Sequence, residues 1–359
     1  MKVAIIVPVF LTGGAENMAS LLALELHRQQ VDVEVISMYP RQDHPFEKRL
    51  EEAGIPLHYM DKDGKGSIAA LARLWKCLNR IRPDVVHTHI YATFYAIPWV
   101  LLHRVIQVHT IHTCPGKDFP RKLNRLLSFM TRLRKMVLVA VSEKNRELGV
   151  TYYGVTEEWV RCVNNPVDIA RFRKTEREED GLVVFANVSR QDENKNQIMA
   201  IRALKNILPQ VPEARLLLVG SGPRHSYLQQ EVRAMGLASL VELPGETARP
   251  EDFLARADVY VSTSNNEGLP LSMLEAEAAG LPVIATKVGG VGDIVRDNGA
   301  LIAPEDQAAL EREMLRFARD GQLRKRCGEA SKAIVCEYDA SGCARKYTEI
   351  YEMFAPGRK

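Results

Sequence analysis

The chain has 359 residues, of which 46% are apolar and 26% charged, a composition typical of a globular protein with room for two domains. Its net charge of +3 is too small to indicate nucleic-acid binding, and no apolar run is long enough to cross a bilayer. The six cysteines form no Cys-x-x-Cys pair, so we expect reduced thiols in a cytoplasmic protein rather than a zinc site or disulfides. We expect no signal peptide, because Lys2 leads directly into a Val/Ile-rich strand.

Short apolar segments alternate with helical patterns in the first half of the chain. After the first segment, Lys2 to Val9, Gly13 and Gly14 form a turn that leads into a helix. Further strands are predicted at 31–38, 55–60, 84–89, 105–112 and 136–141. This alternation indicates a parallel sheet covered on both faces. The Gly13-Gly14 turn either lets the backbone approach a ligand closely or is simply a tight turn. Its sequence is not the G-x-G-x-x-G motif of dinucleotide-binding proteins, so we expect no NAD or other cofactor.

A charge-rich, apolar-poor segment at 171–181 is predicted to be a linker. Beyond it the pattern restarts, with strands predicted at 182–188, 214–219, 240–243, 257–261 and 281–286, and the chain is helical from Pro304. Ligands of open α/β sheets bind outside the carboxyl ends of the strands. Nearly all the Gly-rich and charged loops of this chain follow such ends.

Residues 264–280 combine two carboxylates with the start of a helix. Pro270 fits the first turn, so Glu267 lies in the preceding loop and Glu275 lies inside the helix. The unpaired N–H groups near residues 268–272 would form a site for an anion such as phosphate. Two acids beside such a site suit a ligand that is part phosphate and part polyhydroxyl. They are equally compatible with solvated charges at a helix end.

Several motifs, taken together, resemble the retaining glycosyltransferases of GT-B architecture, a large family that includes sucrose synthases and bacterial mannosyltransferases. The most specific is Glu267-Gly-Leu-Pro-Leu-Ser-Met-Leu-Glu275, which is similar to the family's E-x7-E motif. The others are Gly13-Gly-Ala-Glu16, Asp84-Val-Val-His87, Asn165-Pro-Val-Asp168, Val188-Ser-Arg190 with Lys195-Asn196, Gly220-Ser-Gly-Pro223, Pro282-Val-Ile-Ala-Thr286 and Gly289-Gly290.

The resemblance implies a fold of two Rossmann-like α/β domains that face each other across a cleft. The N-terminal acceptor domain would span residues 1–170 and the C-terminal nucleotide-sugar domain residues 171–338. A C-terminal helix within 339–359 would cross back to the N-terminal domain.

The resemblance also implies roles for individual residues. Arg190 and Lys195 would clamp the donor diphosphate and neutralise the charge of the leaving group; otherwise they are a solvated pair at a helix start. Glu275 would accept hydrogen bonds from the ribose, and Glu267 would bind hydroxyls of the transferred sugar. Donor binding is further implied for Gly13, Gly14, Gly220, Gly245, Gly268, Leu269, Pro270 and Leu271, with Gly245 near the nucleobase.

Three histidines, namely His87, His89 and His112, are candidates for a position near the transferred sugar. His112 ends a predicted strand and is followed by Thr113, as in the family's strand-end histidine, so it is the first choice. His89, also at a strand end, is the second. His87 and, more clearly, His109 fit the commoner case of a core histidine in an apolar strand.

The expected reaction is retaining hexosyl transfer by front-face attack, with the departing phosphate taking the acceptor proton. No suitable Asp-x-Asp loop is present, so we expect metal-independent transfer. Because Lys195-Asn-Gln197 resembles capsule and exopolysaccharide transferases, we expect a UDP-sugar donor and a glycan or lipid-linked acceptor. A nucleotide-sugar epimerase of the same architecture, or a non-catalytic nucleotide-sugar-binding subunit of a polysaccharide assembly complex, remains an alternative.

The chain departs from the family pattern at two places. Asp293 stands where Glu is usual after the Gly-Gly pair, which affects ribose or sugar contacts there. Asn187-Val-Ser189 replaces the common Val-Gly before Arg190, a change that alters packing.

The segment from Lys117 to Lys135 is basic and amphipathic. Its leucines and methionine are predicted to share one helical face, namely Leu123, Leu126, Leu127, Met130 and Leu133. Two interpretations stay open: a domain helix with a solvated cationic face, or a peripheral contact with anionic lipid at the inner face of a membrane. Nucleic acid is not expected, because aromatic residues do not interleave with these cations.

Overall fold

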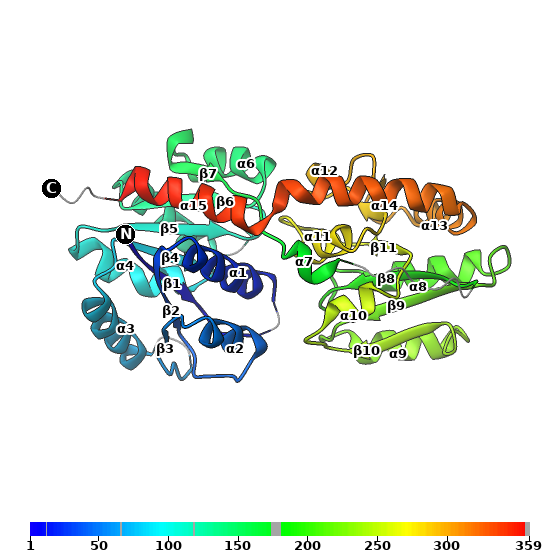
Figure 1. Cartoon of the computed structure of the whole chain (residues 1–359), viewed down its shortest axis with the longest axis horizontal. Helices are drawn as coiled ribbons and strands as arrows, with labels where there is room; N and C mark the ends of the chain where they lie inside the picture. The colour runs from blue at the N-terminus through cyan, green and yellow to red at the C-terminus, as the bar shows by residue number, and fades with distance from the viewer. Residues whose placement is uncertain (12, 65–66, 118, 174–180, 356–359) are drawn as a thin grey trace. The chain divides into compact units, whose positions relative to one another are not determined.

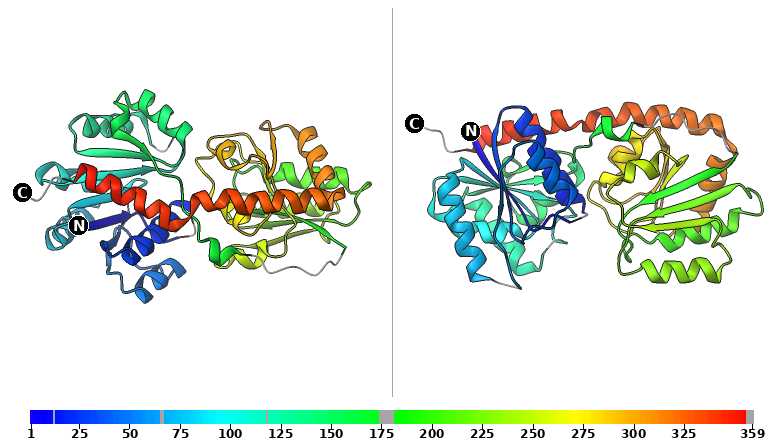
Figure 2. Two further views of the ribbon diagram at one scale, coloured as in Figure 1. Left: turned by 45° about the horizontal axis from the view of Figure 1, so that its top comes forward. Right: turned by 60° about the horizontal axis from the view of Figure 1, so that its bottom comes forward.

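The computed structural model describes residues 1–11, 13–64, 67–117, 119–173 and 181–355. The chain divides into two compact units, one formed by Met1–Pro166 with Ala340–Lys359 and the other by Val167–Asp339. Each unit contains a parallel β-sheet with helices on both faces (Figures 1 and 2). The expected fold class of two Rossmann-like α/β domains is therefore confirmed.

The N-terminal unit is built on a seven-stranded parallel sheet in the order β3-β2-β1-β4-β5-β6-β7. Its central strands are almost continuously buried, because helices cover both faces. The strands are β1 (Lys2–Val7), β2 (Asp32–Ser37), β3 (Leu57–Tyr59), β4 (Val85–His89), β5 (Ile106–Ile111), β6 (Met136–Ala140) and β7 (Val160–Cys162). The helices are α1 (Gly14–Arg28), α2 (Pro45–Glu52), α3 (Ile68–Ile81), α4 (Ala92–Leu102), α5 (Arg121–Arg132) and α6 (Glu143–Tyr153), with a short 3-10 turn at Glu157–Trp159.

The C-terminal helix α15 (Ala340–Phe354) packs on the N-terminal unit, as expected from the sequence. It lies beside α1, the first helix of the chain (Figure 1). Two buried tyrosines fasten it to the sheet: the hydroxyl of Tyr351 lies 2.7 Å from His87 Nδ1, and that of Tyr347 lies 2.9 Å from Thr110 Oγ1. Helices from the first and last parts of the chain therefore pack together in the N-terminal unit.

The C-terminal unit contains a six-stranded parallel sheet in the order β10-β9-β8-β11-β12-β13. The strands are β8 (Val183–Val188), β9 (Ala214–Val219), β10 (Val241–Gly245), β11 (Val259–Ser262), β12 (Val283–Thr286) and β13 (Gly299–Ile302). The helices are α7 (Ile169–Phe172), α8 (Gln197–Ile207), α9 (His225–Ala234), α10 (Pro250–Leu254), α11 (Leu271–Ala278), α12 (Val291–Ile294), α13 (Gln307–Arg319) and α14 (Gly321–Val335), with a 3-10 turn at Cys336–Tyr338.

Two strands, β7 and β13, were not predicted from the sequence. Each has only three or four residues and lacks the long apolar run that marked the others. The predicted linker at 171–181 lies mostly outside the described residues, since 174–180 are not among them. Within the described ranges, no helix has both the length and the apolarity needed to cross a membrane.

Candidate functional site

Most predicted site residues of the C-terminal unit follow the carboxyl ends of its parallel strands. Arg190 and Lys195 lie in the loop after β8, Gly220 follows β9, and Glu267 lies in the loop between β11 and α11. Backbone hydrogen bonds join these loops: Gln191 N donates to Ser221 O at 2.9 Å, and Asn265 N donates to Asn194 O at 2.7 Å. The loops therefore form one connected edge of the sheet.

Lys195 and Glu267 form an ion pair at this edge. Lys195 Nζ lies 2.6 Å from Glu267 Oε1, and the two side chains are only 21% and 10% exposed. Thr263 Oγ1 donates a hydrogen bond of 3.0 Å to the Lys195 carbonyl, and Asn194 Nδ2 donates one of 2.9 Å to the Asn266 carbonyl. Neither charge is a solvated helix-end charge, so that alternative is wrong for Lys195 and Glu267.

Arg190 differs from Lys195, because its side chain is 70% exposed. Arg190 Nε lies 3.7 Å from Asp192 Oδ2, which is a weak contact. The Arg190 carbonyl accepts a hydrogen bond of 2.9 Å from Nε2 of Gln197, the first residue of α8. The backbone of Arg190 is thus held while its guanidinium extends into solvent, where an anion can reach it.

The unusual Asn187-Val-Ser189 sequence fastens the Arg190 loop to the neighbouring strand. Asn187 Nδ2 donates to Val261 O at 2.8 Å, and Ser189 Oγ donates to Asn187 Oδ1 at 2.5 Å. Gln197 Nε2 also donates to Ser189 Oγ at 2.9 Å. The departure from the family pattern therefore supplies a buried polar connection between β8, β11 and α8.

The helix predicted to contain Glu275 is α11 (Leu271–Ala278). Pro270 is the N-cap residue rather than part of the first turn, and α11 begins at Leu271. Leu269 and Leu271 are buried, so these residues can offer only their backbone to a ligand. Glu275 lies inside α11 and is 6% exposed, so it is not a solvated helix-end charge either.

Two glycines permit close approach of backbone segments at this edge. Gly289 has φ +52°, and a Cβ there would collide with the carbonyl of Glu267. Gly220 has φ +126°, and a Cβ there would collide with the carbonyl of Ser189. Both loops need glycine, because an L side chain would be strained by the positive φ and would also displace the neighbouring chain.

Gly245 belongs to β10, whereas the sequence suggested a strand that ended at 243. The register of β10 against β9 shifts between Glu242 and Gly245, and Gly245 has φ +85°. Its carbonyl accepts a hydrogen bond of 2.8 Å from Gly220 N, so the two predicted glycines are neighbours.

Tyr260 is a site-supporting residue that the sequence reasoning missed. Its buried hydroxyl donates to Val188 O at 3.2 Å and lies 2.8 Å from Ser272 Oγ in the first turn of α11. Burial raises the pKa of Tyr260 well above its ordinary value, so the hydroxyl stays protonated. In the sequence, a tyrosine inside an apolar strand carries no signal that distinguishes this role from core packing.

In the N-terminal unit, His112 follows the last residue of β5 and its Nε2 lies 2.9 Å from His89 Nδ1. Burial lowers the pKa of His112 to about 3, with a further contribution from His109. His87 and His109 are buried core residues, the latter with Nδ1 3.1 Å from the carbonyl of Thr88.

Gly13 and Gly14 lie at the start of α1, where Gly13 is the N-cap. The carboxylate of Glu16 lies over Gly13, in the place that a Cβ of residue 13 would occupy. Burial raises the pKa of Glu16 to about 7. The structure thus places His112, Gly13 and Gly14 beyond the carboxyl ends of strands in one unit, and most of the other predicted site residues at such ends in the second unit.

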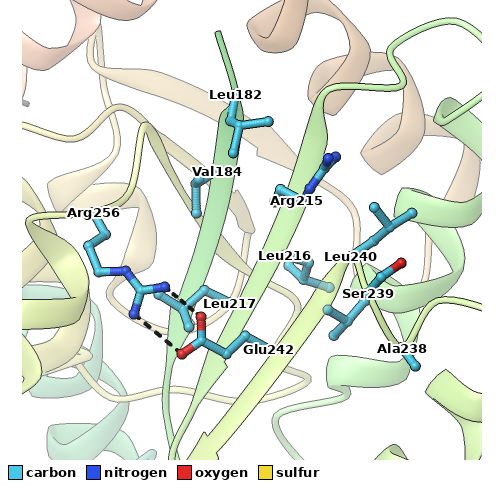
Figure 3. Close-up of a pocket in the computed structure, with 11 residues that line it drawn as sticks. Leu182, Val184, Arg215, Leu216, Leu217, Ala238, Ser239, Leu240, Glu242 and Arg256 are labelled. Atoms are coloured by element: carbon cyan, nitrogen blue, oxygen red, sulfur yellow. Dashed lines mark hydrogen bonds and ion pairs between the residues drawn. The ribbon is translucent and has the colours of Figure 1, made fainter. Parts of the chain in front are cut away.

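The opposite edge of the C-terminal sheet carries a hollow of about 460 Å³ (Figure 3). It lies at the amino-terminal ends of β8 and β9 and the start of β10, where Arg256 pairs with Glu242. None of the predicted site residues lines it. Within the described ranges, no group of three or more His, Cys, Asp or Glu side chains is placed to hold a metal ion.

The basic segment forms α5, but only part of its predicted apolar face is buried. Leu127 and Met130 are fully buried, whereas Leu123 and Leu133 are exposed. The expected apolar face is therefore only partly buried: Leu123 lies in the first turn and Leu133 is the C-cap residue, and both ends of the face are open to solvent. The exposed side has instead Phe129, 53% exposed, at its centre, with cations around it: Arg121, Lys122, Arg125, Arg132 and Arg134.

Two protein-family models match consecutive parts of the chain. Residues 12–171 match "Glycosyltransferase Family 4", and residues 168–334 match "Glycosyl transferases group 1". The putative glycosyltransferase EpsD of Bacillus subtilis is 29% identical over 332 residues, which cover 85% of each chain. The UDP-Gal:alpha-D-GlcNAc-diphosphoundecaprenol alpha-1,3-galactosyltransferase of Escherichia coli is 23% identical over 365 residues, or 90% of this chain and 92% of that one.

Solved structures show the same fold. The crystal structure of Anabaena Alr3699/HepE in complex with UDP-glucose superposes with a TM-score of 0.85 at 21% sequence identity, and covers 98% of this chain and all of that one. TarM of Staphylococcus aureus superposes with a TM-score of 0.80 at 13% identity. The two-unit architecture described above is thus the GT-B fold of these proteins.

Proposed function

The chain belongs to the group 1 glycosyltransferases, which act on nucleotide-sugar donors, and we propose that it is a retaining enzyme that moves a hexosyl group from a UDP-sugar to a glycan or lipid-linked acceptor. The observation that carries this proposal is the enclosed Lys195–Glu267 ion pair beside the start of α11. A cation, an acid and helical N–H groups at one sheet edge match the phosphate and hydroxyl groups of such a donor.

The diphosphate is assigned to Arg190 and Lys195. Within the part of the chain that the structure describes, Arg190 makes only the 3.7 Å ion pair with Asp192, and Lys195 has one unit of opposite charge in Glu267. Binding of a diphosphate between them would supply the missing negative charge, and we propose that these cations stabilise the leaving group without a metal ion. We assign the backbone N–H groups of residues 268 and 271 to the phosphate as further donors that need no side-chain reorganisation.

The two acids are assigned to binding rather than to acid–base catalysis. Glu267 is already engaged by Lys195, and in that state its carboxylate accepts hydrogen bonds from sugar hydroxyls. Glu275, within α11, is assigned to the ribose, and Gly245 to the neighbourhood of the base. His112 is the residue of the N-terminal unit that we assign to the transferred sugar.

In the proposed reaction, the bond between the anomeric carbon and the phosphate oxygen breaks, and a bond to the acceptor oxygen forms on the same face. The proton of the acceptor hydroxyl passes to the departing phosphate. UDP with that proton and the glycosylated acceptor are the products, so charge and atoms balance. Arg190 and Lys195 hold the phosphate whose negative charge grows as the bond breaks.

The choice of a UDP-sugar draws on the relatives. The HepE structure contains UDP-glucose, and the name of the E. coli relative specifies UDP-Gal and a diphosphoundecaprenol acceptor. We propose the same classes of donor and acceptor here. A lipid-linked acceptor also fits the exposed face of α5, where Phe129 and its surrounding cations suit an anionic membrane surface.

The proposal predicts that Lys195→Ala and Glu275→Ala each lower donor turnover by about tenfold or more. Loss of one charge-assisted hydrogen bond at the transition state costs at least about 1.4 kcal/mol, which is a factor of ten in rate. Release of UDP from UDP-sugars, with and without acceptor, measures this turnover and separates transfer from epimerisation.

Lys205→Ala provides a matched control, because Lys205 is an exposed lysine in the last turn of α8. It should keep wild-type turnover. The assignment is wrong if both site variants fold and turn over the donor at the wild-type rate.

A further inference from the structure

We propose that His89 is a positioning residue that keeps the proton of His112 on Nδ1, so that His112 offers its ligand an N–H donor rather than a lone pair. This inference rests on the proposed function only for the identity of the ligand. The tautomer itself follows from contacts within the N-terminal unit.

The two imidazole rings share a single hydrogen bond. His89 Nδ1 lies 2.9 Å from His112 Nε2, and the ring centroids are 5.2 Å apart. Burial lowers the pKa of both side chains far enough that both rings are neutral near pH 7. A hydrogen bond between two neutral imidazoles joins one N–H to one lone pair, so only two arrangements exist.

The remaining nitrogen of His89 distinguishes the two arrangements. His89 is completely buried, and within the described part of the chain its Nε2 has no hydrogen-bond partner. If His112 donated, His89 would carry its proton on Nε2 and would bury an N–H without an acceptor. If His89 donates from Nδ1, its Nε2 keeps only a lone pair. A buried N–H without an acceptor is rarer in proteins than a buried lone pair without a donor, so His89 is the donor.

This arrangement determines what His112 can do. Its Nε2 accepts from His89, so its own proton must lie on Nδ1. His112 is only half-buried, and Nδ1 makes no hydrogen bond to any residue in the described ranges. His112 therefore presents a neutral N–H to an oxygen atom of the ligand, a hydroxyl or a phosphate oxygen, and orients that group without transferring a proton.

The neighbouring histidine of β4 shows that this role is specific to His89. His87 bonds through both nitrogens, with Nδ1 2.7 Å from Tyr351 Oη and Nε2 2.8 Å from Thr110 Oγ1. Its ring thus holds α15 on the sheet and leaves no bond for His112. His87 and His89 lie two residues apart on β4. His87 has a structural role, whereas His89 positions His112.

Nitrogen NMR of the full chain, labelled with 15N in the histidine rings, tests the tautomer without any substrate. At pH 7 we expect the His112 signal to show a protonated Nδ1 and an unprotonated Nε2, with assignment from a His112→Gln sample. The reverse pattern, or a doubly protonated ring, would overturn the proposal while leaving the donor assignment untouched.

Variants of His89 test its effect on His112. His89→Asn keeps an N–H donor close to the place of Nδ1, and should retain the Nδ1–H tautomer and most of kcat. His89→Leu removes the donor, and should give a mixed tautomer and a lower kcat with little change in donor KM. His109→Leu is the control, because His109 has no hydrogen bond to His112 and its loss should leave the tautomer unchanged. Equal tautomer populations in the Asn and Leu variants would contradict the positioning role.

Discussion

Three acidic side chains close together in the chain have three different environments. Glu267 is neutralised by Lys195, Glu275 is buried inside α11, and Glu277 is completely buried two residues later. Glu277 Oε1 accepts a hydrogen bond of 3.0 Å from Asn298 Nδ2, but within the described ranges its Oε2 has no partner. Burial raises the pKa of Glu277 to about 8, so this acid is protonated at neutral pH.

The raised pKa of Glu277 predicts a pH-dependent effect on stability. In the unfolded chain the group ionises near 4.5, and in the folded chain near 8. Its contribution to stability is therefore complete below pH 4.5 and is lost as the pH rises toward 8. Glu277→Gln cannot ionise, so it should match the wild type at pH 5 and be more stable by at least about 1 kcal/mol at pH 8, since one pKa unit corresponds to about 1.4 kcal/mol.

Thermal melting of both proteins at pH 5 and pH 8 measures this difference. Glu329→Gln, at an exposed position of α14 paired with Lys332, is the control and should show no advantage that grows with pH. A Glu277→Gln protein that is equally destabilised at both pH values would show that Glu277 is not protonated in the folded state.

At the scale of elements, α5 shows how far a periodic pattern can be interpreted. The sequence predicted a basic helix, but the division of its apolar residues between core and surface depends on which neighbouring elements cover it. Strand β6 and helix α6 lie against α5, and Leu127 and Met130 are buried. Phe129 is left in solvent, where an exposed aromatic ring among cations is typical of a membrane interface.

This face of α5 predicts binding to anionic vesicles. Phe129 would insert into the interface while the surrounding cations attract anionic headgroups, so binding should fall with added salt. Cosedimentation with phosphatidylglycerol-containing and with purely phosphatidylcholine vesicles measures the effect. Phe129→Glu should reduce retention on the anionic vesicles several-fold.

Leu102→Glu is the matched control, because Leu102 is an exposed apolar residue at the end of α4. It should retain vesicle binding. Equal retention of the wild type on neutral and anionic vesicles would leave α5 as an ordinary surface helix.

At the scale of the whole molecule, the sequence predicted two α/β units and the order of most strands along the chain. Local signals suffice for this, since Pro270 and Gly280 mark the limits of α11 and buried strands are continuously apolar. The motif spacing also placed Glu267 in a loop and Glu275 in a helix.

Contacts between distant segments could not be predicted in the same way. Lys195 and Glu267 are separated by 72 positions, and their pairing depends on β8 and β11 being neighbours in the sheet. The roles of Tyr260, Asn187 and His89 also depend on what lies across from them in space. A buried polar side chain looks the same in sequence whether it supports a site or only the core.

Calorimetric titration with UDP, GDP and ADP tests the proposed donor site of the whole chain most directly. We predict that UDP binds to the wild type, that GDP and ADP bind much more weakly, and that Lys195→Ala loses most of the UDP affinity while Lys205→Ala keeps it. Preference for GDP or ADP, or UDP binding that is unchanged in Lys195→Ala, would contradict a UDP-sugar site built on Lys195 and the start of α11.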